Sequence, residues 1–226
     1  MLKYFILIGL ILLFISLNSK NIENFENKDY KVKDIADQIY IINMDKDVVT
    51  MKKLKKKMNN LGLNYKRITG VDGKKIYKNY NTKLRPGQLG CLLSHQNILK
   101  DAIKNNYNNI LVLEDDIIFH KDFHNQFNLK YKYLIEKEKN YDLIYLGGHQ
   151  SLWNKKLDYW KYTNIKGKYY ETTKTDGTFA MLINKNIFKE ILDFSNKLNL
   201  PIDTLISKYI LKNKNRKCFG FYPHII

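Results

Sequence analysis

Apolar positions along the chain fall into short runs that alternate with longer segments of helical spacing. The runs are typical of buried β-strands, and they cover residues 38–44, 110–113, 142–146 and 179–183. A short second strand is expected at residues 65–68. The run at 110–113 (ILVL) has no polar position on either face, which is the pattern of a central strand covered on both sides.

Between these runs, apolar side chains recur every three or four residues and polar side chains fill the other positions. This spacing predicts helices over residues 50–61, 86–105, 122–136 and 187–198, with a last helix that begins at Pro201. Strands that alternate with helices predict an α/β fold with a mostly parallel central sheet. In such folds, ligands bind at the carboxyl ends of the strands.

The N-terminal part of the chain differs from the rest. Residues 4–17 form an almost unbroken apolar run, somewhat shorter than the ~20 residues of a typical membrane-spanning helix. A cleaved signal peptide has the same form, but no A-x-A-like cleavage site follows, so an uncleaved anchor is preferred. We therefore expect an anchor or signal segment at residues 1–18, a polar stem at 19–37 and a folded domain at 38–226.

The composition supports one folded domain with an appendage. The chain has 226 residues, of which 44% are hydrophobic and 27% charged, as in globular proteins. Two cysteines, Cys91 and Cys218, are too few for a disulfide framework or a structural zinc site. They form either one disulfide bridge or two buried thiols.

The formal net charge of +17 suggests a nucleic-acid or acidic membrane partner. However, nearly all of the positive charge is lysine, and the arginines are Arg67, Arg85 and Arg216. Nucleic-acid surfaces favour arginine because its guanidinium makes bidentate contacts. The abundance of Asn, Ile and Tyr also indicates an AT-rich coding bias. We expect no specific nucleic-acid partner, and a basic nucleic-acid-binding protein remains an alternative class.

Three consecutive acids, Glu114, Asp115 and Asp116, follow the central strand directly. On an extended backbone Glu114 and Asp116 point to one side and Asp115 to the other. Two converging carboxylates repel each other unless a cation lies between them, and oxygen ligands favour Mg²⁺ or Mn²⁺. Such an ion would be shared with a substrate diphosphate. The alternative is that these acids cap the next segment or lie solvated in a loop.

A set of ordered segments carries a resemblance to a known family. In chain order they are IYIINMDKD, RITGVDG, LRPGQLGCLLSHQNILKDAI, ILVLEDDIIF, DLIYLGG, TDGTFAMLINKNIFKEIL and LPID. Together they resemble glycosyltransferase family 25, which includes lipooligosaccharide and procollagen galactosyltransferases. The resemblance runs from about Gln38 to Asp203, and its specificity lies in the ordered set rather than in any one segment.

The resemblance implies a GT-A-like fold and a metal-dependent transfer of a hexose, galactose first, from a UDP-sugar with inversion at the anomeric carbon. The acceptor would be a hydroxyl on a glycan or on a hydroxylysine-like residue, and the domain at 38–226 would be catalytic. Together with the expected N-terminal anchor, the resemblance implies that the catalytic domain is attached to a membrane and lies in a secretory-type lumen. One departure is that the family's first motif usually carries arginine after its aspartate, whereas Asp45 precedes Lys46. A catalytically inactive sugar-binding or scaffold protein of the same fold is therefore the main alternative.

Six further residues are candidates for binding the nucleotide sugar. Asn43 and Asp45 end the first strand, Asp72 lies in a V-D-G turn, and Asp115 lies between the metal candidates Glu114 and Asp116. Ser94 and His95 lie in the expected helix at 86–105. For Asn43, Asp45 and Asp72 the alternative is an ordinary turn role. For His95 it is a buried histidine of the core, because His95 lies near Leu92 and Leu99 on the helical wheel.

An inverting transfer needs a base that takes the proton of the acceptor hydroxyl. Two carboxylates in the later motifs are candidates, Asp203 in Pro-Ile-Asp and Asp176 in Thr-Asp-Gly-Thr. We select Asp203 as the base and Asp176 as the second candidate or an acceptor contact. Asp203 also lies in the first turn of a helix, where the helix dipole favours an acid, and Asp176 suits a simple turn.

Overall fold

The computed structural model describes residues 28–149 and 164–226. The chain divides into the units Met1–Tyr30 and Lys31–Ile226, and the second contains the fold described below. Its elements in chain order are α2 (Val32–Ile35), β1 (Gln38–Asn43), α3 (Val48–Asn60), β2 (Lys66–Thr69), α4 (Gly73–Ile76), η1 (Tyr77–Asn79), α5 (Pro86–Lys104), β3 (Asn109–Glu114), α6 (Phe123–Glu138), β4 (Leu143–His149), β5 (Asn164–Lys166), β6 (Tyr169–Glu171), β7 (Asp176–Asn184), η3 (Lys185–Ile187), α7 (Phe188–Ser195), α8 (Ile202–Leu205), the π-helix η4 (Ile206–Leu211) and β8 (Cys218–Phe221).

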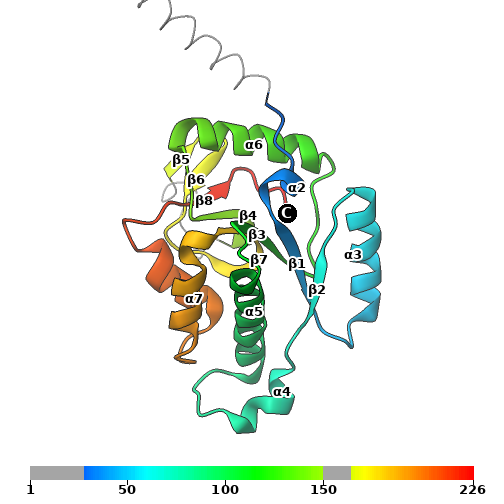
Figure 1. Ribbon diagram of the computed structural model, residues 1–226, viewed down its shortest axis with the longest axis vertical. Helices are drawn as coiled ribbons and strands as arrows, with labels where there is room; N and C mark the ends of the chain where they lie inside the picture. Colours follow the sequence, from blue (N-terminus) through cyan, green and yellow to red (C-terminus); the bar gives the residue numbers. More distant parts are fainter. Residues whose placement is uncertain (1–27, 150–163) are drawn as a thin grey trace, which may run out of the picture. The chain divides into compact units, whose positions relative to one another are not determined.

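One mixed sheet forms the centre of this unit (Figure 1). Its strand order is β2-β1-β3-β7-β4-β8-β6-β5. The pairs β1–β2, β1–β3 and β4–β8 are parallel, whereas β7 runs antiparallel to both β3 and β4. The strands β6–β8 and β5–β6 also pair in antiparallel fashion. The α/β class is confirmed, but the sheet is mixed rather than mostly parallel.

One face of the sheet carries the main hydrophobic core. Side chains that alternate along the central strands, such as Tyr40, Val112 and Met181, pack with the apolar sides of α5, α7, α8 and η4. Within α5, Leu92 and Leu99 are almost completely buried and lie seven positions apart on one helical stripe, as the sequence predicted. Pro86 occupies the first turn of α5, where its missing N–H costs no helical hydrogen bond.

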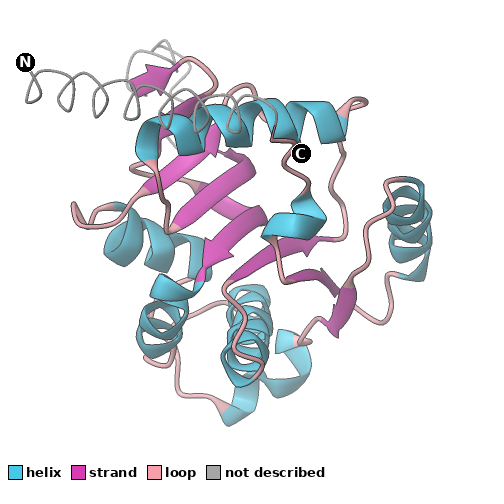
Figure 2. Cartoon of the chain, turned by 45° about the horizontal axis from the view of Figure 1, so that its top comes forward, coloured by secondary structure: helices cyan, strands magenta, loops and turns pink. Residues whose placement is uncertain are grey.

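The opposite face is covered by α6. Strand positions that alternate with those of the first face, including Leu111 and Leu113, are fully buried there. Figures 1 and 2 show α6 on the side of the sheet away from α5 and α7. Its Phe127 packs edge-to-face on Phe221 of β8, with ring centroids 5.9 Å apart. Helices therefore cover the central strands on both sides, as the pattern of residues 110–113 predicted.

The N-terminal region differs from the prediction in its membrane anchor and in the start of the compact unit. The expected membrane anchor and secretory-type lumen are corrected, because no helix within residues 28–149 and 164–226 has the length and apolar character needed to span a bilayer. The segment on which that expectation rested, residues 1–18, lies outside the described residues. The compact unit begins at Lys31, before the boundary expected at Gln38. Val32 is buried, and the backbone N–H of Asp37 donates to Asn109 O at 2.9 Å.

Candidate functional site

The polar side chains of the candidate site come from three neighbouring strands. β1 and β3 are parallel and in register, with Ile42 opposite Glu114, so their carboxyl ends meet at one edge of the sheet. β7 runs antiparallel to β3, so the beginning of β7 lies at that same edge. Acids that follow β3 therefore lie beside the residues that end β1 and those that begin β7.

Asn43, the last residue of β1, links these strands through its buried amide group. Its Oδ1 accepts a hydrogen bond from Arg67 Nε at 2.8 Å. Its Nδ2 donates to a carboxylate oxygen of Asp115 and, at 3.3 Å, to the carbonyl oxygen of Asp47. Only 3% of Asn43 is exposed, so these partners occupy the amide. Asn43 thus fixes Asp115, and its position favours a structural role over direct contact with a nucleotide.

Arg67 of β2 extends this network. Its Nη2 donates to Asp45 Oδ1 at 2.5 Å and to the Asn43 carbonyl oxygen at 3.2 Å. The hydrogen bond and the positive charge of Arg67 lower the pKa of the exposed Asp45 carboxyl group. Asp45 is 72% exposed, so its ion pair contributes little to stability. Arg67 was missed by the sequence reasoning because β2 has little buried surface to indicate where its side chains point.

Glu114 is the most enclosed of the three consecutive acids. Thr178 Oγ1, near the beginning of β7, donates to Glu114 Oε1 at 2.9 Å. Burial raises the pKa of Glu114, and the nearby carboxylates of Asp116 and Asp115 act in the same direction. Among the described residues, no cation forms an ion pair with Glu114. The carboxylate of Glu114 is therefore stabilised by a hydrogen bond from a neutral hydroxyl, and no described cation neutralises its charge.

Asp115 and Asp116 lie in a turn beyond the end of β3. The side-to-side alternation of an extended strand consequently does not apply to them, which is the reason that Glu114 and Asp115 line the same cavity. Asp116 is exposed, and neither a hydrogen bond nor an ion pair joins its carboxylate to any described residue. Both of its oxygens are thus open to a ligand, whereas Asp115 already accepts from Asn43.

The cavity beside Glu114 has a volume of about 290 Å³. Glycines form much of its wall, because α4 and α5 approach each other closely there. A Cβ added to Gly90 would lie 2.3 Å from the carbonyl oxygen of Val71, and one added to Gly73 would lie 1.8 Å from that of Pro86. Lys46 and Lys74 also line this cavity, so positive charge adjoins the acids.

Helix α5 supplies three polar side chains near this cavity. Ser94 is buried and its hydroxyl donates to Gly90 O at 2.7 Å, while it accepts from the backbone N–H of Val71 at 2.9 Å. His95 is 3% exposed, and burial lowers its pKa to about 4. Cys91 lines the cavity, and burial raises the pKa of its thiol to about 12. Both Cys91 and Cys218 are free thiols, so of the two expected cysteine states the second is found.

The two candidate bases differ in their surroundings. Asp203, in the first turn of α8, accepts a hydrogen bond from the backbone N–H of Gly177 at 3.4 Å. Its charge acts on Cys91, His95 and Glu114, which places its carboxylate near all three. Asp176 is exposed at the beginning of β7, and none of these groups senses its charge. The structure thus brings Asp203 to the acids and leaves Asp176 at the periphery.

Asp72 lies on the cavity wall, as a nucleotide-sugar contact would require, but it also caps α4. Its carboxylate accepts from the backbone N–H of Lys74 at 3.1 Å, which is the turn role considered as the alternative. Asp45, in contrast, is absent from the cavity lining. Among the candidates for nucleotide contact, Asp72, Ser94 and Asp115 therefore face the cavity directly.

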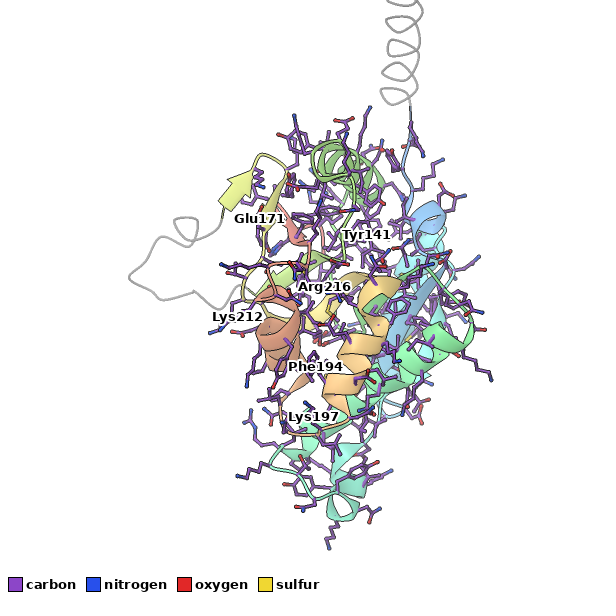
Figure 3. The ribbon with its side chains drawn as sticks, turned by 60° about the vertical axis from the view of Figure 1, so that its left-hand side comes forward. Tyr141, Glu171, Phe194, Lys197, Lys212 and Arg216 are labelled. Atoms are coloured by element: carbon purple, nitrogen blue, oxygen red, sulfur yellow. The ribbon has the colours of Figure 1, made fainter. Side chains whose placement is uncertain are left out.

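A second cavity, of about 540 Å³, lies at the opposite edge of the sheet, beside the beginning of β8. Glu171, Lys212 and Arg216, labelled in Figure 3, are among its lining residues. Arg216 forms ion pairs with Glu190 at 2.5 Å and with Asp142 at 3.7 Å. Arg216 at this cavity is therefore paired with acids, whereas Glu114 at the other edge has no paired cation among the described residues.

Comparison with known proteins identifies the family. The sequence profile of glycosyltransferase family 25 (LPS biosynthesis protein) matches residues 36–206, about three quarters of the chain. The chain belongs to glycosyltransferase family 25. All of the site residues discussed above, from Asn43 to Asp203, fall within the matched region, and the predicted family membership is confirmed.

Individual members of family 25 align with parts of this chain. A glycosyltransferase 25 family member of Anopheles gambiae is 32% identical over 128 residues, which cover 48% of this chain and 21% of that protein. Procollagen galactosyltransferase 1-A of Xenopus laevis is 28% identical over 146 residues, covering 56% and 24% respectively. The aligned parts are thus less than a quarter of the length of either relative.

Among solved structures, a glycosyltransferase involved in the glycosylation of the major capsid of PBCV-1 is similar to this chain. The sequences are 11% identical, the TM-score is 0.44, and the match covers 81% of this chain and 80% of the other.

Three site residues were not predicted from the sequence. Arg67 and Thr178 were not considered, and Cys91 was considered only as a thiol or disulfide partner. For Cys91 a signal exists, because it precedes His95 by four residues and such positions share one face of a helix. For Thr178 the reversed direction of β7 had to be known first, since the hydroxyl contacts Glu114 only because β7 is antiparallel to β3.

Proposed function

We propose that this family 25 glycosyltransferase moves a hexose, galactose in the first instance, from a UDP-sugar to a hydroxyl acceptor with inversion. One observation carries the proposal. The carboxylates of Glu114, Asp116 and Asp203 gather at the carboxyl ends of β1 and β3, and no described cation pairs with them. Glu114 lines the 290 Å³ cavity, and Asp116 lines a neighbouring cavity together with Asp115. In a chain of net charge +17, acids left without a paired cation in this way indicate a cation that arrives with a ligand.

The residues present fit a divalent cation such as Mn²⁺ or Mg²⁺. Glu114 keeps Oε2 free while Oε1 accepts from Thr178, and Asp116 has both oxygens without a described partner. Hard oxygen ligands of this kind suit these ions. The bound ion would supply charge neutralisation to the diphosphate of the leaving UDP.

The surrounding side chains fit the donor and the acceptor. Lys46 and Lys74 line the cavity and can pair with phosphate oxygens, and Asp72 and Asp115 can accept from ribose hydroxyls. Asp203 would take the proton of the acceptor hydroxyl. As it does so, the hydroxyl oxygen of the acceptor forms a bond to the anomeric carbon of the sugar, and the bond between that carbon and the UDP oxygen breaks. Attack from the side opposite UDP inverts the configuration at that carbon.

The alternative of an inactive sugar-binding protein rests on the missing arginine after Asp45. Here Arg67 brings a guanidinium to the end of β1, where it donates to Asp45 and to Asn43. We infer that Arg67 provides the planar donor that the motif itself lacks. This favours an active enzyme over the scaffold protein.

The direct test is a screen of UDP-sugars for Mn²⁺-dependent release of UDP in the presence of hydroxyl acceptors. We expect UDP-galactose to be turned over, and a chelator to abolish the release. Glu114→Gln should remove this activity, and Glu136→Gln, a change on α6 away from the site, should keep it. Donor binding without turnover of any UDP-sugar would favour the inactive sugar-binding protein instead.

A further inference from the structure

Cys91, His95 and Glu114 form a cluster that the proposed function does not use as a unit. One potential ligand atom from each side chain (the thiol sulfur, an imidazole nitrogen and a carboxylate oxygen) lies within 4.8 Å of the other two. The first two residues come from α5 and the third from the end of β3, so the cluster joins two elements that pack in the core.

The backbone holds these groups in place without any ligand. Cys91 and His95 are four residues apart on a 19-residue helix, so their side chains lie on the same face one turn apart. Glu114 is fixed by the hydrogen bond from Thr178. Most of the ordering that binding would require has therefore been completed on folding.

His95 provides an independent indication of a ligand. It is 3% exposed, and its Nε2 atom is buried without a hydrogen-bond partner among the described residues. A buried polar atom without a partner lowers the stability of the folded state, and such atoms are rare in folded proteins. A ligand that takes the lone pair or the proton of this imidazole would remove that cost.

We propose that Cys91, His95 and Glu114 bind one zinc-class cation, Zn²⁺ or Co²⁺, with three protein ligands and an open position toward the 290 Å³ cavity. A thiolate with an imidazole and a carboxylate suits these borderline ions, whereas Mg²⁺ and Mn²⁺ prefer oxygen ligands. Cys91 would release its thiol proton to solvent as the metal–sulfur bond forms. Tetrahedral zinc separates its ligand atoms by about 3.5 Å, so any pair of these atoms that lies farther apart, up to 4.8 Å, must draw together on binding.

This site does not depend on sugar transfer, but it shares Glu114 with the proposed oxygen-ligand site. A zinc ion bound by the cluster would occupy Glu114 and lower the affinity of the oxygen-ligand site for Mn²⁺. A count of cysteines misses such a site, because a mixed ligand set needs only one thiolate.

The test is a titration of the full-length protein with Co²⁺ alone, followed by absorption spectroscopy. We expect a near-ultraviolet band from thiolate-to-cobalt charge transfer, which one equivalent of Zn²⁺ abolishes. The chain offers a matched control, since Cys218 is its other cysteine and lies at the opposite edge of the sheet. Cys91→Ser should lose the band and Cys218→Ser should keep it, while His95→Gln should weaken Zn²⁺ binding by more than about 100-fold.

A measurement on the unaltered protein covers the case in which Cys91→Ser does not fold. X-ray absorption at the zinc edge, with one Zn²⁺ bound per chain, should show one sulfur at about 2.3 Å. A shell of nitrogen and oxygen only, or a cobalt band that survives Cys91→Ser, would overturn the proposal. Either result would leave the UDP-sugar proposal intact, because that proposal uses oxygen ligands and is tested by UDP release.

Discussion

The two edges of the central sheet differ in how their acidic side chains are paired. At the edge where β4 and β8 begin, Asp142 accepts from the backbone N–H of Lys217 at 2.9 Å and from Asn186 Nδ2 at 3.3 Å, and it adjoins Arg216 at 3.7 Å. At the other edge Glu114 has one neutral hydroxyl partner, and Asp116 has none among the described residues.

Two asparagine side chains, one at each edge, differ in the same way. Asn109, at the first edge, accepts from Tyr141 at 3.0 Å and from Asn184 at 2.9 Å, so it ties three strand ends together. Asn43, at the second edge, instead holds a carboxylate that faces a cavity. A buried acid with several partners, such as Asp142, therefore stabilises the fold, whereas an acid without a paired cation indicates a binding site.

The largest effect is expected for Asp203→Asn. Without a base for the acceptor hydroxyl, turnover of the UDP-sugar should fall by about 10²–10⁴-fold, while UDP binding and the free energy of unfolding stay nearly unchanged. Steady-state kinetics and thermal unfolding measure the two quantities. Asp193→Asn, an exposed acid on α7, is the matched control and should behave as wild type. If Asp203→Asn lowers the melting temperature but keeps the activity per folded molecule, Asp203 serves only as a helix-capping acid.

Asp142→Ala should have the opposite signature. Three groups would lose their buried partner, so the free energy of unfolding should fall by about 3 kcal/mol. Turnover per folded molecule should remain that of wild type, because Asp142 lies at the edge away from the cavity. Urea unfolding with Asp193→Ala as a control measures the loss. An unchanged stability would contradict the view that this edge is structural.

Gly90→Ala tests the glycine wall of the cavity. The added methyl group would meet the carbonyl oxygen of Val71 at 2.3 Å, so α4 and α5 must move apart. We expect a loss of about 1–3 kcal/mol in the free energy of unfolding and weaker UDP binding. Gly87→Ala is the control, since nothing lies within 4 Å of its added carbon. Equal stability of the two variants would show that the close approach of the helices is not needed.

The same reasoning about partners applies to a buried cation. Lys130 of α6 is 1% exposed and donates to the carbonyl oxygen of Tyr222 at 2.8 Å, and burial lowers its pKa to about 8. Below pH 8 both the folded and the unfolded chain carry the proton, so the full cost of burying the charge is present. As the pH rises from about 8 to about 10.5, the folded chain loses the proton first and becomes more stable.

Lys130→Met should abolish this dependence. Relative to the variant, the wild type should gain about 3 kcal/mol of stability across that pH window. Urea unfolding at several pH values measures the difference, with the exposed Lys121→Met as a control. A wild type that loses stability relative to the variant over the same window would contradict the assignment of burial as the cause.

Much of the fold could be predicted from the spacing of apolar residues. The run at 38–44 became β1, the lysine-rich segment at 50–61 became α3, and the run at 110–113 became the centre of β3. Strand direction was not predictable in this way, since the pattern of β7 is the same whether it runs parallel or antiparallel to β3. The short strands β5 and β6 were also missed, because three residues carry too little periodicity.

The candidate site was predictable where chemistry follows from position in the chain. Acids after a buried strand must lie at a sheet edge, and His95 was expected either at the site or in the core, where its burial places it. The geometry around Asp115 was not predictable, because β3 ends at Glu114 and the turn changes the direction of the next two side chains. Contacts between distant strands, such as Thr178 with Glu114, needed the topology.

If the acids after β3 hold a cation for a nucleoside diphosphate, that cation should strengthen the binding of UDP, which a calorimetric titration measures. The measurement compares UDP affinity with and without Mn²⁺ for the wild type, for Asp116→Asn and for the control Glu136→Gln. We expect Mn²⁺ to tighten UDP binding at least about tenfold in the wild type and the control, and Asp116→Asn to abolish this gain. UDP binding that is the same with and without Mn²⁺ in the wild type would show that these acids hold no such cation.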